Sequence, residues 1–132
     1  MTTEDRFLES LRQELDREQR SLGEPYVVCW RDLDPAVAAE EVERLASWVD
    51  WIVQRYRIDH KSIPPCWAEH GALVEELSAL HILWTACYLE DASPSDAVGF
   101  HRELDSALRR LREWSSRRGC TRTEHRPEPK DC

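Results

Sequence analysis

Apolar residues recur at helical spacing in four separate stretches of the chain. The first stretch begins at Thr3 and continues to about Arg20, before Gly23 and Pro25 interrupt it. Its apolar members are Phe7, Leu8, Leu11 and Leu15. Steps of three and four residues place such side chains on one helix face, so we predict an N-terminal amphipathic helix. Its stripe is narrow, which leaves two alternatives: the helix packs on the domain, or it is an arm that binds a partner or a second copy.

The second stretch follows a short β-prone run, 26–30, which is too short and too isolated to build a sheet and which we interpret as an extended connector. Asp34 before Pro35 predicts a helix start, because aspartate caps free amides and proline suits the first helical position. The apolar stripe runs to about residue 58 and consists of Val42, Leu45, Val49, Ile52, Val53 and Tyr56. Tryptophans at 48 and 51 widen this face, which indicates a central helix.

The clearest pattern begins near Cys66, after a loop that ends in two prolines, and alternates steps of four and three. Its members are Cys66, His70, Leu73, Leu77, Leu80, Trp84 and Cys87. We therefore predict a helix over 66–89, with Cys66 and His70 on the same inward face as the leucines. The segment Ser93-Pro-Ser-Asp96 predicts the capped start of a last helix that ends at Gly119. Its expected inner stripe is Ala97, His101, Leu104, Leu108 and Leu111, flanked by Phe100 and Trp114.

These elements predict an all-α fold, a small helical bundle of three long helices plus an N-terminal amphipathic helix. A chain of 132 residues suits one domain. We expect residues 1–24 to form the N-terminal helix or arm, residues 25–126 to form the bundle domain, and residues 127–132 to be a disordered tail rich in proline and charge.

The net charge of −8 is spread unevenly. Residues 1–46 hold twelve acids and six bases, residues 47–108 ten and four, and residues 109–132 four and eight. An acidic body repels nucleic acid and anionic membranes, so any contact with nucleic acid must come from the basic end. The charged N-terminus lacks an apolar signal core and no apolar run approaches ~18 residues, which favours a cytoplasmic protein without membrane contact.

Two Cys/His pairs carry the only evident chemistry. The predicted helices 66–89 and 94–117 are each about 35 Å long and are joined by a short loop, so they should be antiparallel neighbours. The chain then returns to the level at which the third helix began. We therefore expect Cys66, His70, Cys120 and His125 to converge. Thiolate and imidazole are the donors that zinc prefers, and four protein ligands make a closed structural site.

Other interpretations of these residues remain open. A buried cysteine is often a small apolar residue, a histidine near a helix start is often only hydrogen-bonded, and neither pair has the C-x2-C spacing of strong zinc motifs. The cysteine number is five, which is odd, and two cysteines lie within helical patterns, so reduced thiols or metal ligands are favoured over disulfides. His60 is the expected substitute if His125 does not ligate. A water in the fourth position would make the site catalytic.

The remaining histidines, His81 and His101, are expected to be core residues, with Asp105 placed one turn later to orient His101. No nucleophile elbow, thioredoxin-like motif, di-iron motif or phosphate loop is present, which makes an enzyme the less favoured class. Arginines could allow the last helix to contact phosphates, namely Arg109, Arg110, Arg112, Arg117 and Arg118, with Arg122 and Arg126 beyond them. We favour their pairing with acidic residues nearby and in the first helices.

The segment 63–77, with its Pro-Pro-Cys-Trp-x-x-His core, together with Trp84, Cys120 and His125, resembles a family of small actinobacterial helical proteins. The likeness covers about residues 42–126. That family is associated with plasmids, integrative elements and phage-like regions, so the resemblance implies an origin in a mobile genetic element and no particular activity. The absence of Asn and the sixteen Arg against two Lys agree with a high-G+C source.

The sequence as a whole favours a non-enzymatic module for protein interaction, or an accessory module of a mobile genetic element, stabilised by zinc. Its partner would be an unidentified protein or a second copy of the chain. One alternative is a DNA-associated regulator that uses the Arg-rich C-terminal helix. The other is a metal-dependent hydrolase.

Overall fold

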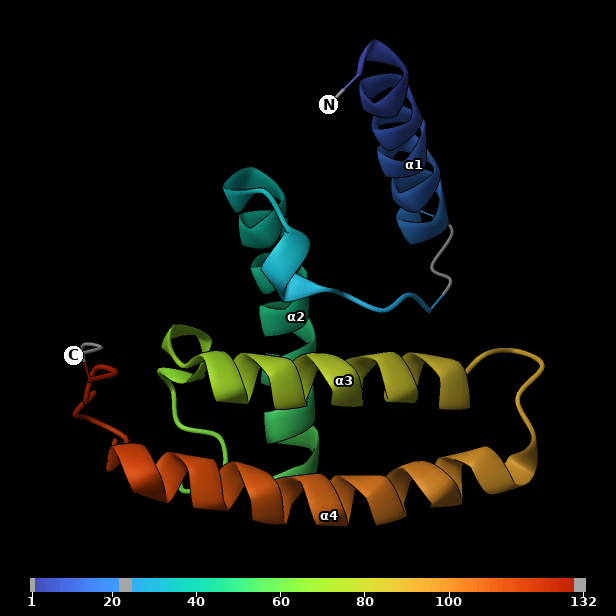
Figure 1. The fold of residues 1–132 in the computed structure, drawn as a ribbon. Helices are drawn as coiled ribbons and strands as arrows, with labels where there is room; N and C mark the ends of the chain where they lie inside the picture. Colours follow the sequence, from blue (N-terminus) through green and yellow to red (C-terminus); the bar gives the residue numbers. More distant parts are fainter. Residues whose placement is uncertain (1, 22–24, 130–132) are drawn as a thin grey trace.

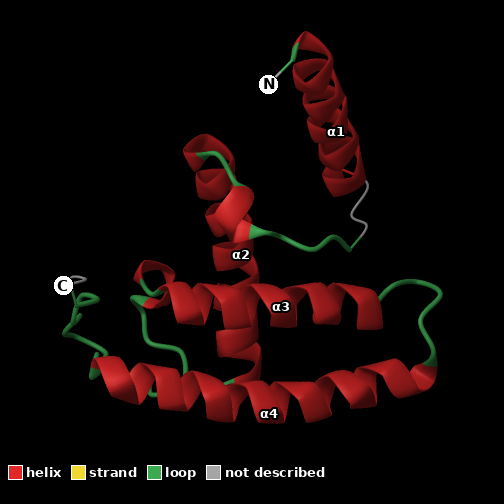
Figure 2. Ribbon diagram, in the orientation of Figure 1, coloured by secondary structure: helices red, strands yellow, loops and turns green. Residues whose placement is uncertain are grey.

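The computed structural model describes residues 2–21 and 25–129. Within these residues the chain forms four α-helices, two 3-10 helices and no strand, which confirms the all-α prediction (Figure 2). The α-helices are α1 (Thr3–Ser21), α2 (Pro35–Tyr56), α3 (Gly71–Cys87) and α4 (Pro94–Arg118). The 3-10 helices are η1 (Trp30–Asp32) and η2 (Trp67–Glu69). Predicted features at residues 1, 22–24 and 130–132, among them Gly23 and the end of the tail, lie outside the described residues.

Helices α3 and α4 form an antiparallel hairpin and lie side by side (Figure 1). The predicted start of α4 is confirmed, because the backbone N–H of Ser93 donates to Asp96 Oδ2 at 3.0 Å and Pro94 occupies the first turn. The predicted end is also confirmed. Gly119 caps α4 with a left-handed φ of 76°, a conformation that glycine adopts without the strain of a Cβ atom.

Helix α2 crosses the α3–α4 pair steeply instead of running alongside it (Figure 1). Its start is as predicted, since Asp34 Oδ1 accepts a hydrogen bond from the N–H of Ala36 at 3.3 Å. It ends at Tyr56, with Arg57 in a left-handed conformation. The short loop 88–93 forces α3 and α4 to be antiparallel. The segment 57–70 between α2 and α3 is longer, so it leaves the angle between these two helices free.

The core is built from one face of each of these three helices and from the segment before α3. Its buried apolar residues are Leu45, Trp48, Val49, Ile52, Ile63, Trp67, Leu73, Val74, Leu77, Leu80, Phe100, Leu104, Ala107 and Leu111. Pro64 is also fully buried. The buried hydroxyl of Ser115 on α4 donates to the carbonyl oxygen of Ser62 at 3.1 Å. The segment before α3 is therefore fixed by the core, and it carries Cys66 and His70 with it.

The predicted start of the third helix is wrong. The helix begins at Gly71, not near Cys66, and the residues between the prolines and Gly71 form η2. His70 is extended, with φ −122° and ψ 112°, so Cys66 and His70 do not share the inner face of α3. Burial of Trp67 explains the difference, because the tight turn carries this large side chain into the core.

The inner face of α4 also differs from the prediction. Its buried residues are Phe100, Leu104, Ala107, Leu111 and Ser115, so Phe100 is fully buried and His101 is exposed. The predicted stripe is one position off at His101 and at Leu108, where Phe100 and Ala107 are the buried residues. Burial of a phenylalanine ring removes more apolar surface from water than burial of an imidazole, whose polar nitrogens would then need partners.

Helix α1 lies apart from α2, α3 and α4 (Figure 1). All four residues of its apolar stripe are exposed: Phe7 by 63%, Leu8 by 58%, Leu11 by 41% and Leu15 by 62%. The apolar stripe of α1 therefore does not pack against the other helices in this structure. Among the described residues, no helix combines the length and the apolar character that a bilayer span requires.

Candidate metal centre

The two Cys/His pairs lie at the same end of the α3–α4 hairpin. Cys66 and His70 flank η2, where Glu69 N–H donates to Cys66 O at 3.0 Å and His70 N–H donates to Trp67 O at 3.1 Å. Cys120 and His125 follow Gly119, in the segment that turns back after α4. We predicted that Cys66 and His70 would be brought together on one face of a helix. The turn at η2 brings them together instead.

The four predicted side chains converge on one point. His70 Nε2 lies 3.6 Å from Cys66 Sγ and 3.3 Å from Cys120 Sγ. His125 Nδ1 lies 3.7 Å from Cys120 Sγ. One ligand atom from each of the four residues falls within 4.8 Å of every other, which is close enough for the group to bind a metal ion.

The second pair is held by a turn in the segment after α4. Thr121 N–H donates to Glu124 O at 2.8 Å, and Glu124 N–H donates to Thr121 Oγ1 at 2.9 Å. This turn aims the N–H of Arg126 at Cys120 Sγ, with a distance of 3.1 Å. This hydrogen bond helps to fix the position of Cys120 Sγ in the cluster.

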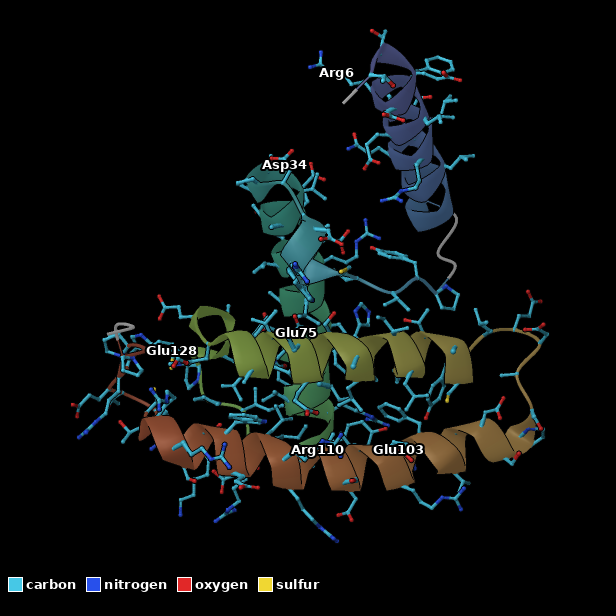
Figure 3. All side chains as sticks on the ribbon, in the orientation of Figure 1. Arg6, Asp34, Glu75, Glu103, Arg110 and Glu128 are labelled. Carbon is cyan, nitrogen blue, oxygen red and sulfur yellow. The ribbon has the colours of Figure 1, made fainter. Side chains whose placement is uncertain are left out.

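Each histidine of the cluster directs its other ring nitrogen to a carboxylate. His70 Nδ1 lies 2.7 Å from Glu128 Oε1, and His125 Nε2 lies 3.2 Å from Glu69 Oε2. The second oxygen of Glu128 is 3.2 Å from Arg118 Nη1, and the Glu128 side chain reaches the hairpin end where α4 finishes (Figure 3). Such carboxylates fix the ring orientation and tautomer of metal-binding histidines.

Sequence reasoning missed both carboxylates. Glu128 falls within the stretch predicted to be a disordered tail, and Glu69 falls within the predicted helix 66–89. Acidic residues are frequent in this chain, so neither position carries a signal of its own. The extended backbone of His70 and the path of residues 119–129 bring them into place.

Burial differs across the cluster. His70 is only 1% exposed, Cys66 and Cys120 are half-buried, and His125 lies on the outer side. Burial, together with the hydrogen bond and charge of the neighbouring Cys120, raises the pKa of the Cys66 thiol to about 11. At neutral pH this thiol is therefore protonated unless a cation compensates its charge.

The other histidines do not join the cluster. His60 Nδ1 lies 3.1 Å from Asp59, and His60 does not belong to the group of converging ligands. His81 is half-buried and stacks on Trp48 with a centroid distance of 4.9 Å.

His101 is not a core residue, and this prediction is wrong. It is exposed, and its Nε2 lies 2.9 Å from the hydroxyl of Tyr56. Asp105 contacts Arg109 at 2.8 Å instead of orienting His101. The exposed position of His101 follows from the rotation of α4 that buries Phe100.

Four of the five arginines singled out on α4 contact carboxylates. Arg109 pairs with Asp105, Arg110 with Glu76, Arg117 with Glu113 and Arg118 with Glu128. The partners lie on α3, on α4 and in the segment after α4, not in the first helices. This pairing reduces the positive charge that the helix presents to solvent.

A scan of protein-family models, a search of curated proteins and a search of solved structures each give no match. The fold and the cluster therefore define the class by themselves: a small all-α protein whose helical hairpin carries a candidate four-ligand metal centre at one end.

Proposed function

We propose that Cys66, His70, Cys120 and His125 hold one zinc ion. With Zn–S bonds of about 2.3 Å and Zn–N bonds of about 2.05 Å, the ligand atoms of a tetrahedral site are separated by about 3.3–3.8 Å. The three distances of 3.3, 3.6 and 3.7 Å match this range before any ion is added. This agreement between spacing and donor type carries the proposal.

The proposed role of the zinc is structural. Two thiolates and two imidazoles complete a tetrahedral shell, so no position remains for the water that a hydrolase needs. The nearby carboxylates of Glu69 and Glu128 are engaged with the imidazoles and act as positioning groups. We therefore favour the structural role over the metal-dependent hydrolase.

Zinc would fix the segment after α4 to the segment before α3. Residues 121–129 are exposed along their whole length, so this segment has little apolar burial to hold it in place. Metal binding would stabilise the folded segment. The ligands come together only on folding, so the free energy of metal binding adds to the free energy of unfolding. The Pro-Pro-Cys-Trp-x-x-His core then has a structural meaning: Pro64 and Trp67 anchor the turn, and Cys66 and His70 provide ligands.

Metal content and thermal melting test this proposal. Native mass spectrometry should find one zinc per chain, and a chelator should lower the melting temperature. Cys120→Ser should abolish zinc binding, whereas Cys87→Ser, at the opposite end of α3, should retain it. A metal-free protein whose melting is indifferent to chelator would rule out the zinc.

We further propose that the zinc-stabilised body presents α1 to a protein partner. The support is the exposed stripe on a helix that lies apart from the body (Figure 1). An isolated helix of this length is marginal in water, so cover by a partner would stabilise it. The resemblance of the Pro-Pro-Cys-Trp-x-x-His segment to mobile-element proteins suggests that this partner belongs to such an element.

The interaction is tested by quantitative pull-down from the source cells. A partner retained by the intact protein and lost with Leu11→Glu and Leu15→Glu together would support the interaction role. Equal recovery with both proteins would contradict it. Because both substitutions lie on an exposed face, the melting temperature of the body should be unchanged.

A further inference from the structure

The two cysteines of the candidate metal centre are also placed for a second kind of chemistry. His70 Nε2 lies 3.6 Å from Cys66 Sγ and 3.3 Å from Cys120 Sγ, so both sulfur atoms face the same nitrogen. The two sulfur atoms lie within 4.8 Å of each other, and both thiols are free. A disulfide bond is about 2.05 Å long, so the sulfur atoms would have to approach each other by less than about 3 Å to form one.

The other cysteines lie elsewhere in the chain. Cys29 is exposed on the connector before η1. Cys87 ends α3, which is 17 residues long, so it lies about 25 Å along the helix axis from the end near the metal centre. Cys132 lies outside the described residues. An oxidant that reaches the hairpin end therefore meets two cysteines that both belong to the converging group of ligands.

The backbone is held less firmly at Cys120 than at Cys66. Cys66 lies between Pro64 and Trp67, which are buried and fix it to the core. Cys120 precedes residues 121–129, all of which are exposed. The polar contacts of such a segment rearrange more readily than core packing does. Cys120 can therefore move towards Cys66 while the core stays as it is.

We propose that Cys66 and Cys120 form a redox switch, in which an oxidant of the peroxide class converts the two metal-bound thiolates into one disulfide bond and expels the metal ion. The expulsion of the metal rests on the zinc site proposed above. The disulfide itself rests only on the positions of the two cysteines.

The electrons and atoms of this oxidation balance with hydrogen peroxide as the oxidant. One thiolate attacks a peroxide oxygen, the O–O bond breaks, and the sulfur becomes a sulfenic acid as hydroxide leaves. The second thiolate attacks that sulfur, the S–S bond forms, and a second hydroxide leaves. Two protons from solvent turn the hydroxides into water, and two electrons have passed from the sulfur atoms to the peroxide. Zinc leaves because it binds thiolates, which the disulfide no longer offers.

Loss of the metal would release the segment after α4 beyond its first residue. Cys120 stays fixed by the disulfide, whereas His125 loses the bond that held it to the centre. Residues 121–129 then keep only hydrogen bonds and ion pairs, and local opening becomes more frequent. Trypsin cleaves after arginine, and Arg122 is exposed in this segment. Cleavage after Arg122 should therefore be severalfold faster in the oxidised protein than in the zinc-bound protein.

Oxidation of the zinc-loaded, full-length protein with a small molar excess of hydrogen peroxide tests the proposal. A chromogenic chelator should record the release of one zinc per chain, beyond the release seen without peroxide. Peptide mapping by mass spectrometry should then find a disulfide between Cys66 and Cys120. Dithiothreitol followed by zinc should restore the starting protein, because thiols reduce a disulfide but do not reduce a sulfinic acid.

Cys87→Ser is the matched control, because it removes a thiol from the opposite end of α3. This variant should release zinc and form the disulfide to the same extent as the unaltered protein. Cys120→Ser, oxidised without metal, should form no disulfide at Cys66. A bond from Cys66 to Cys29, Cys87 or Cys132 in any of these proteins would show that the fold does not select the pair.

The outcomes separate this proposal from the zinc site. Zinc release without a disulfide between Cys66 and Cys120 would overturn the switch and leave the zinc site intact. A protein that holds no zinc but still forms this disulfide would support the pairing and contradict the zinc site. Equal rates of cleavage after Arg122 before and after oxidation would overturn the release of the segment.

Discussion

At the scale of single residues, the two ring nitrogens of each histidine in the candidate metal centre have different partners. His70 turns Nε2 towards the two cysteines and Nδ1 towards Glu128. A neutral imidazole has one protonated and one bare nitrogen, and the carboxylate selects the form with the proton on Nδ1. The nitrogen that faces the sulfurs is then bare and ready to bind a metal.

Glu128→Gln should therefore weaken zinc affinity about 10- to 100-fold, since the amide supports the required tautomer less strongly than the carboxylate. Competition with a chelator of known affinity measures the effect. Glu124→Gln is the matched control, because it removes the same charge from the same segment. Equal affinities of the two variants would show that Glu128 does not position His70.

The raised pKa of Cys66 predicts the pH dependence of metal binding. Below its pKa of about 11, the Cys66 thiol is protonated in the metal-free protein and must lose its proton when zinc binds. Zinc affinity should therefore rise with pH, by about tenfold per pH unit for this thiol. Competition titrations between about pH 7.5 and pH 9 avoid the range in which imidazoles titrate. Affinity that is flat over this range would contradict the proposed thiolate ligation.

At the scale of the elements, the end of α4 determines whether the second Cys/His pair can reach the first. Gly119 has a φ of 76°, and this left-handed residue turns the chain from the helix towards Cys120. Gly71, at the start of α3, has no positive φ, and a Cβ atom there would meet nothing within 4 Å. The two glycines therefore have different structural roles.

Gly119→Ala should lower the free energy of unfolding by about 1 kcal/mol, because a side chain is strained in the left-handed region. Zinc affinity should fall with it as Cys120 is displaced. Gly71→Ala should instead raise the free energy of unfolding by about 0.5 kcal/mol, since it restricts the unfolded chain at no steric cost. Urea unfolding of both variants measures these changes. Identical effects would mean that backbone conformation at Gly119 is unimportant.

Local signals made some of the elements predictable. The caps at Asp34 and Ser93 depend on residues close in sequence, so the starts of α2 and α4 could be placed from the sequence. The start of α3 could not. The spacing from Cys66 to His70 fits one turn of an α-helix as well as it fits the 3-10 turn that is observed. Burial of Trp67 and His70 decides between these two conformations.

Convergence of the four ligands was predicted from two helices of equal length, yet α3 has 17 residues and α4 has 25. The four ligands still converge, because η2 and the prolines before it extend along the hairpin as far as a longer α3 would have reached. Glu69 and Glu128 could not be found in this way, since their positions depend on the tertiary path of two loops.

At the scale of the whole molecule, the core, the segment after α4 and helix α1 are held by different kinds of contact. The core formed by α2, α3, α4 and the segment before α3 is continuous and includes fully buried residues such as Ile52 and Leu77. The segment after α4 relies on polar contacts at the candidate metal centre. The described side chains of α1 that form its apolar stripe are exposed. Stability should therefore reside in the core, with the metal centre adding a local contribution.

Deletion of residues 1–24 tests this division. The shortened protein should unfold with a free energy within about 0.5 kcal/mol of the full chain, because the apolar stripe formed by Phe7, Leu8, Leu11 and Leu15 is exposed and its removal forfeits little burial. It should also keep one zinc per chain, since the four proposed ligands, Cys66, His70, Cys120 and His125, lie outside the deleted segment. Leu77→Ala is the contrasting variant: Leu77 is 0% exposed, and its truncation should cost about 3 kcal/mol. Urea unfolding and native mass spectrometry measure both quantities. If the deletion costs as much as Leu77→Ala, α1 packs on the body in solution and its stripe is not free for a partner.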